Sequence, residues 1–292
     1  GGVEAARAVL NPHLTEFLLA ASSGRGDVVL AEVAIEAGSA QAEPTLSVQR
    51  LSKSFANGPC VLSGVDIGIR PGESVALIGA NGTGKSTLVR CLLRLIEPDA
   101  GGIRMFGLDV RSLPARSLRR LRSRVGFVFQ RHNLVLRLSA LSNVIHGAQA
   151  RMSGPGSWYQ ALAPRRVRDE AMTCLERVSL DGKAGARADS LSGGQSQRVA
   201  IARMLMQRPE FVIADEPDAS LDPKSGEEIM RLLHESARER GLGLLFVSHD
   251  LDHAIEYSDR IVGLAAGRVA LDIRSNAADP AELRKFFDEA RP

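Results

Sequence analysis

The sequence predicts an α/β fold in which a largely parallel sheet is covered by helices on both faces. Short apolar runs alternate with helical stretches along the chain, and the runs are continuously apolar, as in strands that are buried on both faces. The expected strands of this sheet cover residues 74–78, 125–129, 211–214 and 244–247.

Two further regions are expected around this core. Alternating apolar residues at 46–48 and 61–69 predict an antiparallel β subdomain that precedes the core. The stretch from about 131 to 190 has no such strand and predicts an inserted helical subdomain. A hairpin turning at Ala266-Gly267 is expected near the end of the main domain, which we place at residues 45–274.

The two ends of the chain differ from this domain. Residues 1–44 are rich in Ala and Gly and hold no catalytic cluster, so we expect an N-terminal extension of unknown role. Residues 275–292 are expected to form a helical tail, because Asp279 precedes Pro280 in a pattern typical of a helix start.

The composition argues against several classes of protein. Aromatic residues make up 4% of the 292 residues and the net charge is +3, so no nucleic-acid partner is expected. No apolar run approaches the ~20 residues of a membrane span, so other chains would have to form any pore. Cys60, Cys91 and Cys174 lack metal-ligand spacing and are expected to be small buried hydrophobic residues.

A run of arginines lies between residues 116 and 124, with Leu118 and Leu121 inside it at helical spacing. This pattern favours the solvated face of a half-buried helix. The alternative is a contact with a partner protein or with lipid headgroups.

Residues 79–86 fit the G-x-x-x-x-G-K-[ST] pattern between an apolar strand and an amphipathic helix. Glycines let backbone N–H groups surround phosphate oxygens, and the helix N-terminus adds a partial positive charge. Lys85 is expected to bind the β- and γ-phosphates, and Ser86 to offer its oxygen to Mg²⁺. The candidate nucleotide-binding residues here are Gly79, Asn81, Gly82, Thr83, Gly84, Lys85, Ser86 and Thr87.

An apolar strand at 211–214 ends in the acid pair Asp215-Glu216. Acids at strand ends are common on solvated loops, but beside a phosphate loop they indicate phosphoryl-transfer chemistry. We expect Asp215 to hold Mg²⁺, directly or in its second shell, and Glu216 to act as a general base or to orient the attacking water.

A second glycine motif, Leu191-Ser192-Gly193-Gly194-Gln195, precedes a helix expected to run to Gln207. Ser192 and Gln195 fit a capping box, which is the structural interpretation. That interpretation leaves the two glycines unexplained, because each costs up to ~1 kcal/mol against Ala in a helix. A second anion-binding helix N-terminus would account for them.

This motif resembles the signature of ABC ATPases, and the phosphate loop, signature and acid strand follow that family's order. The resemblance covers about residues 45–274 and implies a P-loop NTPase (RecA-like) core. It also implies that Ser192, Gly193, Gly194 and Gln195 of one protomer bind the ATP held by a second protomer, so that a homodimer buries two ATP molecules.

The resemblance assigns four more positions. Gln130 matches the glutamine that touches Mg²⁺ and water and senses the membrane partner. His249 matches the switch histidine at the γ-phosphate, although a lone histidine at a strand end is often structural. Asp222 lies in the loop that links the two sites. Phe55 matches the aromatic that stacks on adenine, or is a strand core residue.

Within this family, residues 129–139 and 175–178 resemble the ATP-binding subunits of phosphonate importers, while Ser248-His249-Asp250 departs from their usual Leu-His-Gln. The resemblance implies ATP and Mg²⁺ as cofactors, transmembrane permease partners, an indirect link to a periplasmic or extracellular binding protein, and a place on the cytoplasmic face of the membrane. Three alternatives remain: a cassette for another substrate such as lipoprotein, phosphate or amino acids, a soluble ABC ATPase in DNA repair or translation, and a non-hydrolysing partner.

Overall fold

The computed structural model describes residues 43–55, 58, 60–130, 133–152, 154, 156 and 160–289. The predicted extension over 1–44 lies outside these residues except for Glu43 and Pro44, so its role stays a prediction.

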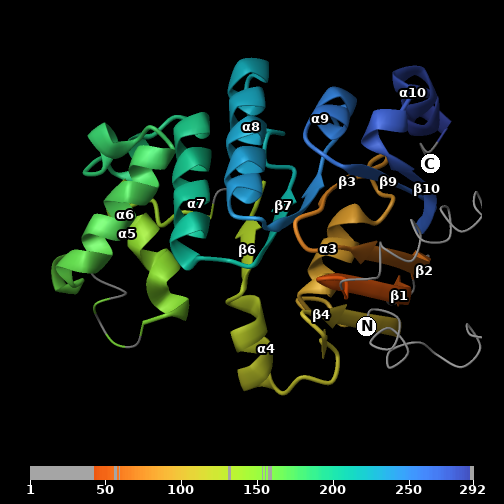
Figure 1. Cartoon of the computed structure of the whole chain (residues 1–292), viewed down its shortest axis with the longest axis horizontal. Coiled ribbons are helices and arrows are strands. Elements are labelled where there is room, and N and C mark those ends of the chain that lie inside the picture. The colour runs from red at the N-terminus through yellow and green to blue at the C-terminus, as the bar shows by residue number, and fades with distance from the viewer. Residues whose placement is uncertain are drawn as a thin grey trace, which may run out of the picture. The chain divides into compact units, whose positions relative to one another are not determined.

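A six-stranded sheet forms the centre of the domain (Figure 1). Its strand order is β10-β9-β3-β8-β7-β6, and all neighbouring pairs are parallel except β9 with β10, the hairpin predicted at Ala266-Gly267. The strands are β3 Ser74–Ile78, β6 Val125–Val128, β7 Phe211–Asp215, β8 Gly243–Val247, β9 Arg260–Ala265 and β10 Arg268–Arg274. The predicted α/β fold with a mainly parallel sheet is confirmed.

Both faces of this sheet are buried, as its continuously apolar strands predict. In β8, Leu244 and Phe246 pack into one hydrophobic cluster, while Leu245 and Val247 pack into the other. The first cluster contains the helices that follow β6, and the second contains the phosphate-loop helix α3, Lys85–Leu92, and the antiparallel strands. Because successive side chains of a strand point to opposite faces of the sheet, one strand contributes side chains to both hydrophobic clusters.

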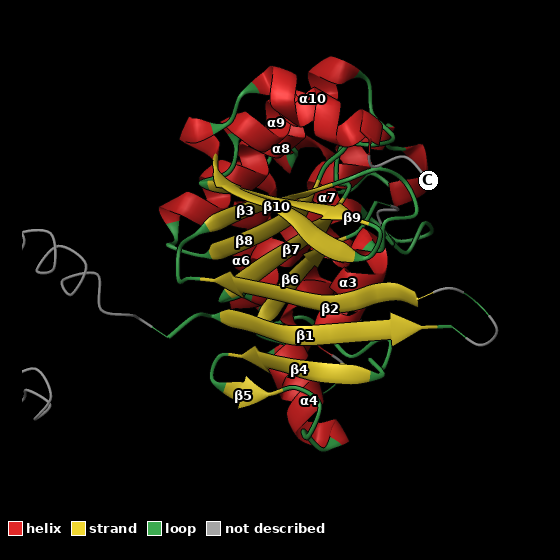
Figure 2. Cartoon of the chain, turned by 90° about the vertical axis from the view of Figure 1, so that its right-hand side faces the viewer, coloured by secondary structure: helices red, strands yellow, loops and turns green. Residues whose placement is uncertain are grey.

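A second, antiparallel sheet has the order β2-β1-β4-β5 (Figure 2). Its strands are β1 Leu46–Ser54, β2 Cys60–Ile69, β4 Ala100–Met105 and β5 Leu108–Asp109. Our expectation that this subdomain precedes the core was wrong in part, because β4 and β5 follow the phosphate loop and α3 in the chain. Cys60 is also exposed rather than buried, unlike Cys91 and Cys174.

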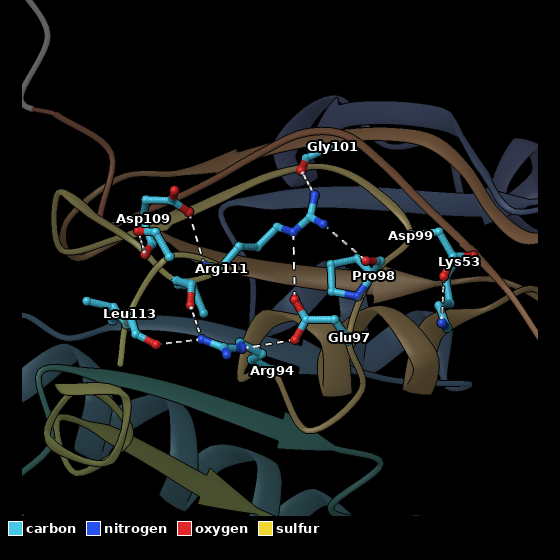
Figure 3. A network of polar contacts seen from close by, with 11 residues as sticks. Lys53, Arg94, Glu97, Pro98, Asp99, Gly101, Asp109, Arg111 and Leu113 are labelled. Carbon is cyan, nitrogen blue, oxygen red and sulfur yellow. Dashed lines mark hydrogen bonds and ion pairs between the residues drawn. The ribbon is translucent and has the colours of Figure 1, made fainter. Parts of the chain in front are cut away.

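Two arginines fix the chain between α3 and the antiparallel sheet (Figure 3). Arg94 binds Glu97 at 2.9 Å and the Leu113 carbonyl at 2.7 Å. Arg111 donates to the Gly101 carbonyl at 2.5 Å. Because α3 begins at Lys85, these bonds help to hold the helix that the phosphate loop enters.

The helical subdomain is confirmed between β6 and β7. Its helices α5 and α6 pack against α7, which carries the second glycine motif at its start. The helices of the domain after α3 are α4 Ala115–Arg122, α5 Ala140–Ile145, α6 Arg165–Arg177, α7 Gly193–Gln207, α8 Pro223–Glu239, α9 Leu251–Glu256 and α10 Pro280–Glu289.

The arginine run forms α4, in which Leu118 and Leu121 are buried and Arg116, Arg119 and Arg120 are exposed. This is the half-buried helix that the spacing predicts. Across the described ranges, none of the helices has the length and apolar character that crossing a bilayer requires.

Candidate functional site

The phosphate loop leaves β3 and enters α3 through three glycines in the left-handed region. Their φ angles are 145° at Gly79, 84° at Gly82 and 104° at Gly84. A Cβ at Gly84 would lie 2.7 Å from the Val61 carbonyl oxygen, so glycine is needed there for both conformation and space. The loop thus has the geometry that the G-x-x-x-x-G-K-[ST] pattern predicts.

Lys85 lies inside this loop and is only 4% exposed. Its Nζ donates to the carbonyl oxygens of Gly79 at 2.7 Å and Ala80 at 3.0 Å. Burial lowers the pKa of Lys85, while the charges of Glu216 and Asp215 oppose that shift. Thr83 adds a bond to the Ala80 carbonyl at 2.9 Å, so the loop's own side chains hold it closed around the lysine.

The acid strand brings Asp215 next to the start of α3. Ser86 Oγ donates to Asp215 Oδ1 at 3.4 Å, a long and weak hydrogen bond. Burial raises the pKa of Asp215, and the neighbouring charge of Glu216 raises it further. Two oxygen donors from distant parts of the chain therefore face each other, and hard oxygen ligands are what Mg²⁺ prefers.

Glu216 follows β7 and faces His249, which lies two positions beyond the end of β8. Glu216 Oε1 accepts a hydrogen bond from His249 Nε2 at 2.6 Å. Glu216 also has a φ of 50°, in the left-handed region that non-glycine residues seldom adopt. Backbone strain of this kind costs about 1–3 kcal/mol and is concentrated at functional sites.

Residues 216–220 form a turn after β7, and sequence reasoning missed two side chains that hold this turn. Gln197, fully buried in α7, donates from Nε2 to the Pro217 carbonyl at 2.8 Å. His253 in α9 donates from Nδ1 to Asp218 Oδ2 at 2.7 Å. The only sequence signal for Gln197 is its position two residues beyond Gln195 in the second glycine motif. No sequence signal indicated that His253 and Asp218 form a pair.

The second glycine motif forms the start of α7. Ser192 Oγ accepts from the Gln195 backbone N–H at 3.3 Å, and the Gln195 side chain accepts from the Ser192 N–H at 3.2 Å. The capping box is therefore present. Neither glycine has a positive φ, and a Cβ at Gly194 would lie 3.5 Å from Ser225, an ordinary contact. Within one chain, nothing described requires glycine at Gly194.

The remaining predicted residues lie at the edges of this arrangement. Asp222 is the N-cap of α8 and accepts from the Ser225 N–H at 3.0 Å. Gln130 follows β6, is exposed, and makes no described contact with Lys85 or Glu216. Phe55 is 46% exposed, which contradicts a core role, and the Lys53 Nζ lies 5.6 Å from its ring centroid.

The candidate site residues are related through the order of the strands that precede them. Lys85, His249, Glu216 and Gln130 follow β3, β8, β7 and β6, which are consecutive neighbours in the parallel sheet. Carboxyl ends of parallel strands share one edge, where open α/β sheets bind their ligands. The four groups, spread along the chain, thus belong to one edge of the sheet.

Comparison with known proteins gives consistent results. A family model described as ABC transporter matches residues 62–219. The chain is 44% identical over 242 residues to the phosphonates import ATP-binding protein PhnC of Alcaligenes faecalis, covering 83% of this chain and 87% of that protein. A protein of the same name from Frankia casuarinae is 49% identical over 231 residues, with coverages of 79% and 91%.

Solved structures agree with these relatives. A dimeric ATP-binding cassette in a post-hydrolysis state with ADP and Pi is 33% identical, has a TM-score of 0.70, and is matched over 79% of this chain and 98% of that chain. The cbiO1 subunit of the cbiONQ transporter from Clostridium perfringens is 31% identical, with a TM-score of 0.72 and coverages of 83% and 94%. The chain therefore belongs to the ABC transporter family, as an ATP-binding ATPase cassette.

Proposed function

We propose that this chain hydrolyses ATP as one half of a two-protomer nucleotide sandwich and powers the import of phosphonate or a related oxyanion. The observation that carries the ATPase part is the row of Lys85, His249, Glu216 and Gln130 along consecutive strand ends. The relatives named phosphonates import ATP-binding protein support the substrate.

In this proposal, the phosphate loop binds the triphosphate. The backbone N–H groups of the loop and the N-terminus of α3 surround the phosphate oxygens, and Lys85 exchanges its two loop carbonyls for the β- and γ-phosphates. Phe55, exposed beside Lys53, stacks on adenine. Stacking of a base on an aromatic ring contributes about 1–3 kcal/mol.

Mg²⁺ fits the oxygen donors of Ser86 and Asp215, with Gln130 as a third candidate ligand. When bound, Mg²⁺ neutralises charge on the β- and γ-phosphate oxygens. Desolvation disfavours the charged Asp215 carboxylate and outweighs the opposing charges of Arg90 and Lys85, so a bound cation would further stabilise the charged form.

Hydrolysis then depends on Glu216 and His249. Glu216 accepts a proton from the attacking water, or orients that water, and His249 contacts the γ-phosphate. The 2.6 Å bond between them lets the imidazole orient the carboxylate until the γ-phosphate engages the histidine. Phosphoryl transfer needs mainly positioning and charge stabilisation, which these groups supply.

The second half of the site is contributed by the partner protomer. Ser192, Gly193, Gly194 and Gln195 at the start of α7 bind the γ-phosphate held by the other chain, and Asp222 links the two sites. Among the described residues of this chain, none requires glycine at Gly194, and this supports the role, because close approach of a phosphate to the backbone is a separate reason for glycine.

We further infer that a permease docks at a groove between α4, the helical subdomain and the end of α7, on the cytoplasmic face of the membrane. Among the described residues that line it, none is acidic and six are arginines, which are Arg116, Arg119, Arg120, Arg122, Arg151 and Arg203. Arg151 is already paired with Glu170 at 2.9 Å. This charge fits an acidic cytoplasmic segment of a membrane partner. A binding protein would act through the permease.

Reconstitution with the permease and binding protein tests the proposal. We expect a phosphonate to stimulate ATP hydrolysis, and phosphate or amino acids to stimulate it less. Replacing Arg116, Arg119 and Arg120 with glutamate should remove stimulation and leave the ATPase rate of the isolated chain unchanged. If an amino acid stimulates hydrolysis and a phosphonate does not, the proposed substrate is wrong.

A further inference from the structure

Two imidazole–carboxylate bridges join the same two segments of the chain. Glu216 and Asp218 lie in the turn after β7, while His249 and His253 lie in the segment after β8. The bridge from His249 to Glu216 measures 2.6 Å, and that from His253 to Asp218 measures 2.7 Å. The second is more shielded from solvent, with side chains 13% and 12% exposed against 32% and 17%.

The second bridge favours the protonated form of His253. The carboxylates that face or surround it come from the turn, α8 and α9, and are Asp218, Asp222, Glu227, Asp250, Asp252 and Glu256. Among the described residues that line this hollow, His253 is the only basic one. The bond to Asp218 raises the pKa of His253, against the opposing effect of burial, and Asp250 at 4.0 Å adds to the rise.

We propose that His253 is a positioning residue: by binding Asp218, it holds the turn that carries Glu216 in reach of His249. The turn is also held by Gln197 of α7, which donates to the Pro217 carbonyl. Such restraint is needed because Glu216 adopts a strained backbone conformation.

This inference rests on the proposed function, in which Glu216 serves the attacking water. His253 touches no reacting atom; it acts through Asp218. Loss of the bridge should therefore lower kcat rather than weaken ATP binding, since Lys85 and the phosphate loop make no described contact with it.

The first test compares two histidines that flank one ring. His253 and His234 both lie 5.8 Å from the ring centroid of Tyr257, but only His253 binds the turn, whereas His234 bonds the Tyr257 carbonyl. We expect His253→Ala to lower kcat about tenfold with KM for ATP within about twofold. His234→Ala should leave both close to the parent values. Equal effects of the two variants would overturn the proposal.

The second test measures kcat as a function of pH. If His253 had only a structural role, replacing it would leave the shape of this curve unchanged. In the parent chain, kcat should fall as the pH rises through the raised pKa of His253. His253→Gln keeps a hydrogen-bond donor and cannot titrate, so this alkaline fall should disappear. If the fall persists unchanged in His253→Gln, the titrating group lies elsewhere and the proposal is wrong.

A double-mutant cycle covers the case in which His253→Ala does not fold. It combines His253→Leu with Asp218→Ala, because each of these changes removes one side of the hydrogen bond. Coupled effects of the two positions on kcat support the bridge, and additive effects refute it. Failure of the proposed function would look different from failure of the His253 proposal. In that case the parent chain would hydrolyse no ATP, or its hydrolysis would not depend on Glu216, whatever the effect of changing His253.

Discussion

Glu216 Oε1 and His249 Nε2 lie 2.6 Å apart, although 33 positions separate the two residues in the chain. They meet because β7 and β8 are parallel neighbours, with Asp215 opposite Val247 in the register. Each side chain then leaves its strand at the same edge of the sheet. The proposed hydrolytic pair is therefore a direct result of strand order.

Glu216→Gln should reduce the rate of ATP hydrolysis by about 10²–10⁴, because the amide cannot accept the proton of the attacking water. Steady-state phosphate release measures this. Glu235→Gln, on the exposed face of α8, is the control and should match the parent rate. Hydrolysis by Glu216→Gln at the parent rate would show that Glu216 has no such role.

Much of this site follows from the sequence because each group lies in the segment that follows a buried apolar strand. The strands before Lys85, Glu216 and His249 are recognisable from composition alone, and parallel strands bring their carboxyl ends together. The glycine pattern before Lys85 adds a backbone requirement that few other structures share. Local rules therefore predict the fold class and the positions of these groups.

Other features depend on tertiary context that local rules do not contain. The sequence of β4, Ala-Gly-Gly-Ile-Arg-Met, begins like a turn, and pairing with β1 makes it a strand. The bond of His253 to Asp218 joins residues 35 positions apart and needs α9 to pack beside the turn. Nothing in the spacing of either residue indicates that contact.

Lys85→Ala should weaken ATP binding by at least about 30-fold, because it removes the buried charge that we propose binds the phosphates. It should also lower Tm, since two carbonyls lose their donor. Thermal scans test both effects. ATP at about 100 times the parent Kd should stabilise the parent chain by about 2.7 kcal/mol and Lys85→Ala by no more than about 0.9 kcal/mol. Lys183→Ala is the control; an equal ATP response in Lys85→Ala would contradict the assignment.

Gly84→Ala and Gly82→Ala form a matched pair in the phosphate loop. Both glycines have positive φ, but a Cβ at Gly84 would clash with Val61 and Leu62, whereas nothing lies within 4 Å of one at Gly82. Gly82→Ala should cost about 1–2 kcal/mol for conformation alone, and Gly84→Ala about 1–3 kcal/mol more. Chemical denaturation measures the difference. Equal losses would mean that close packing is not why residue 84 is glycine.

His253→Ala should lower Tm more at pH 6 than at pH 9. The folded-state pKa of His253 is raised above its ordinary value of 6.5, so the bridge stabilises the fold fully below about pH 6.5. That contribution is lost as the pH rises through the folded-state pKa. Thermal unfolding of the parent and variant at both pH values tests the sign, and a larger difference at pH 9 would contradict it.

The central claim is that two anion sites, one around Lys85 and one at the start of α7, meet across a pair of chains. Sedimentation velocity of Glu216→Gln with ATP should reveal a dimer. Adding Gly194→Asp should abolish that dimer by opposing the triphosphate, while Tm stays the same, since an acid in the first turn of a helix is favourable. An ATP-dependent dimer that survives Gly194→Asp would contradict the account.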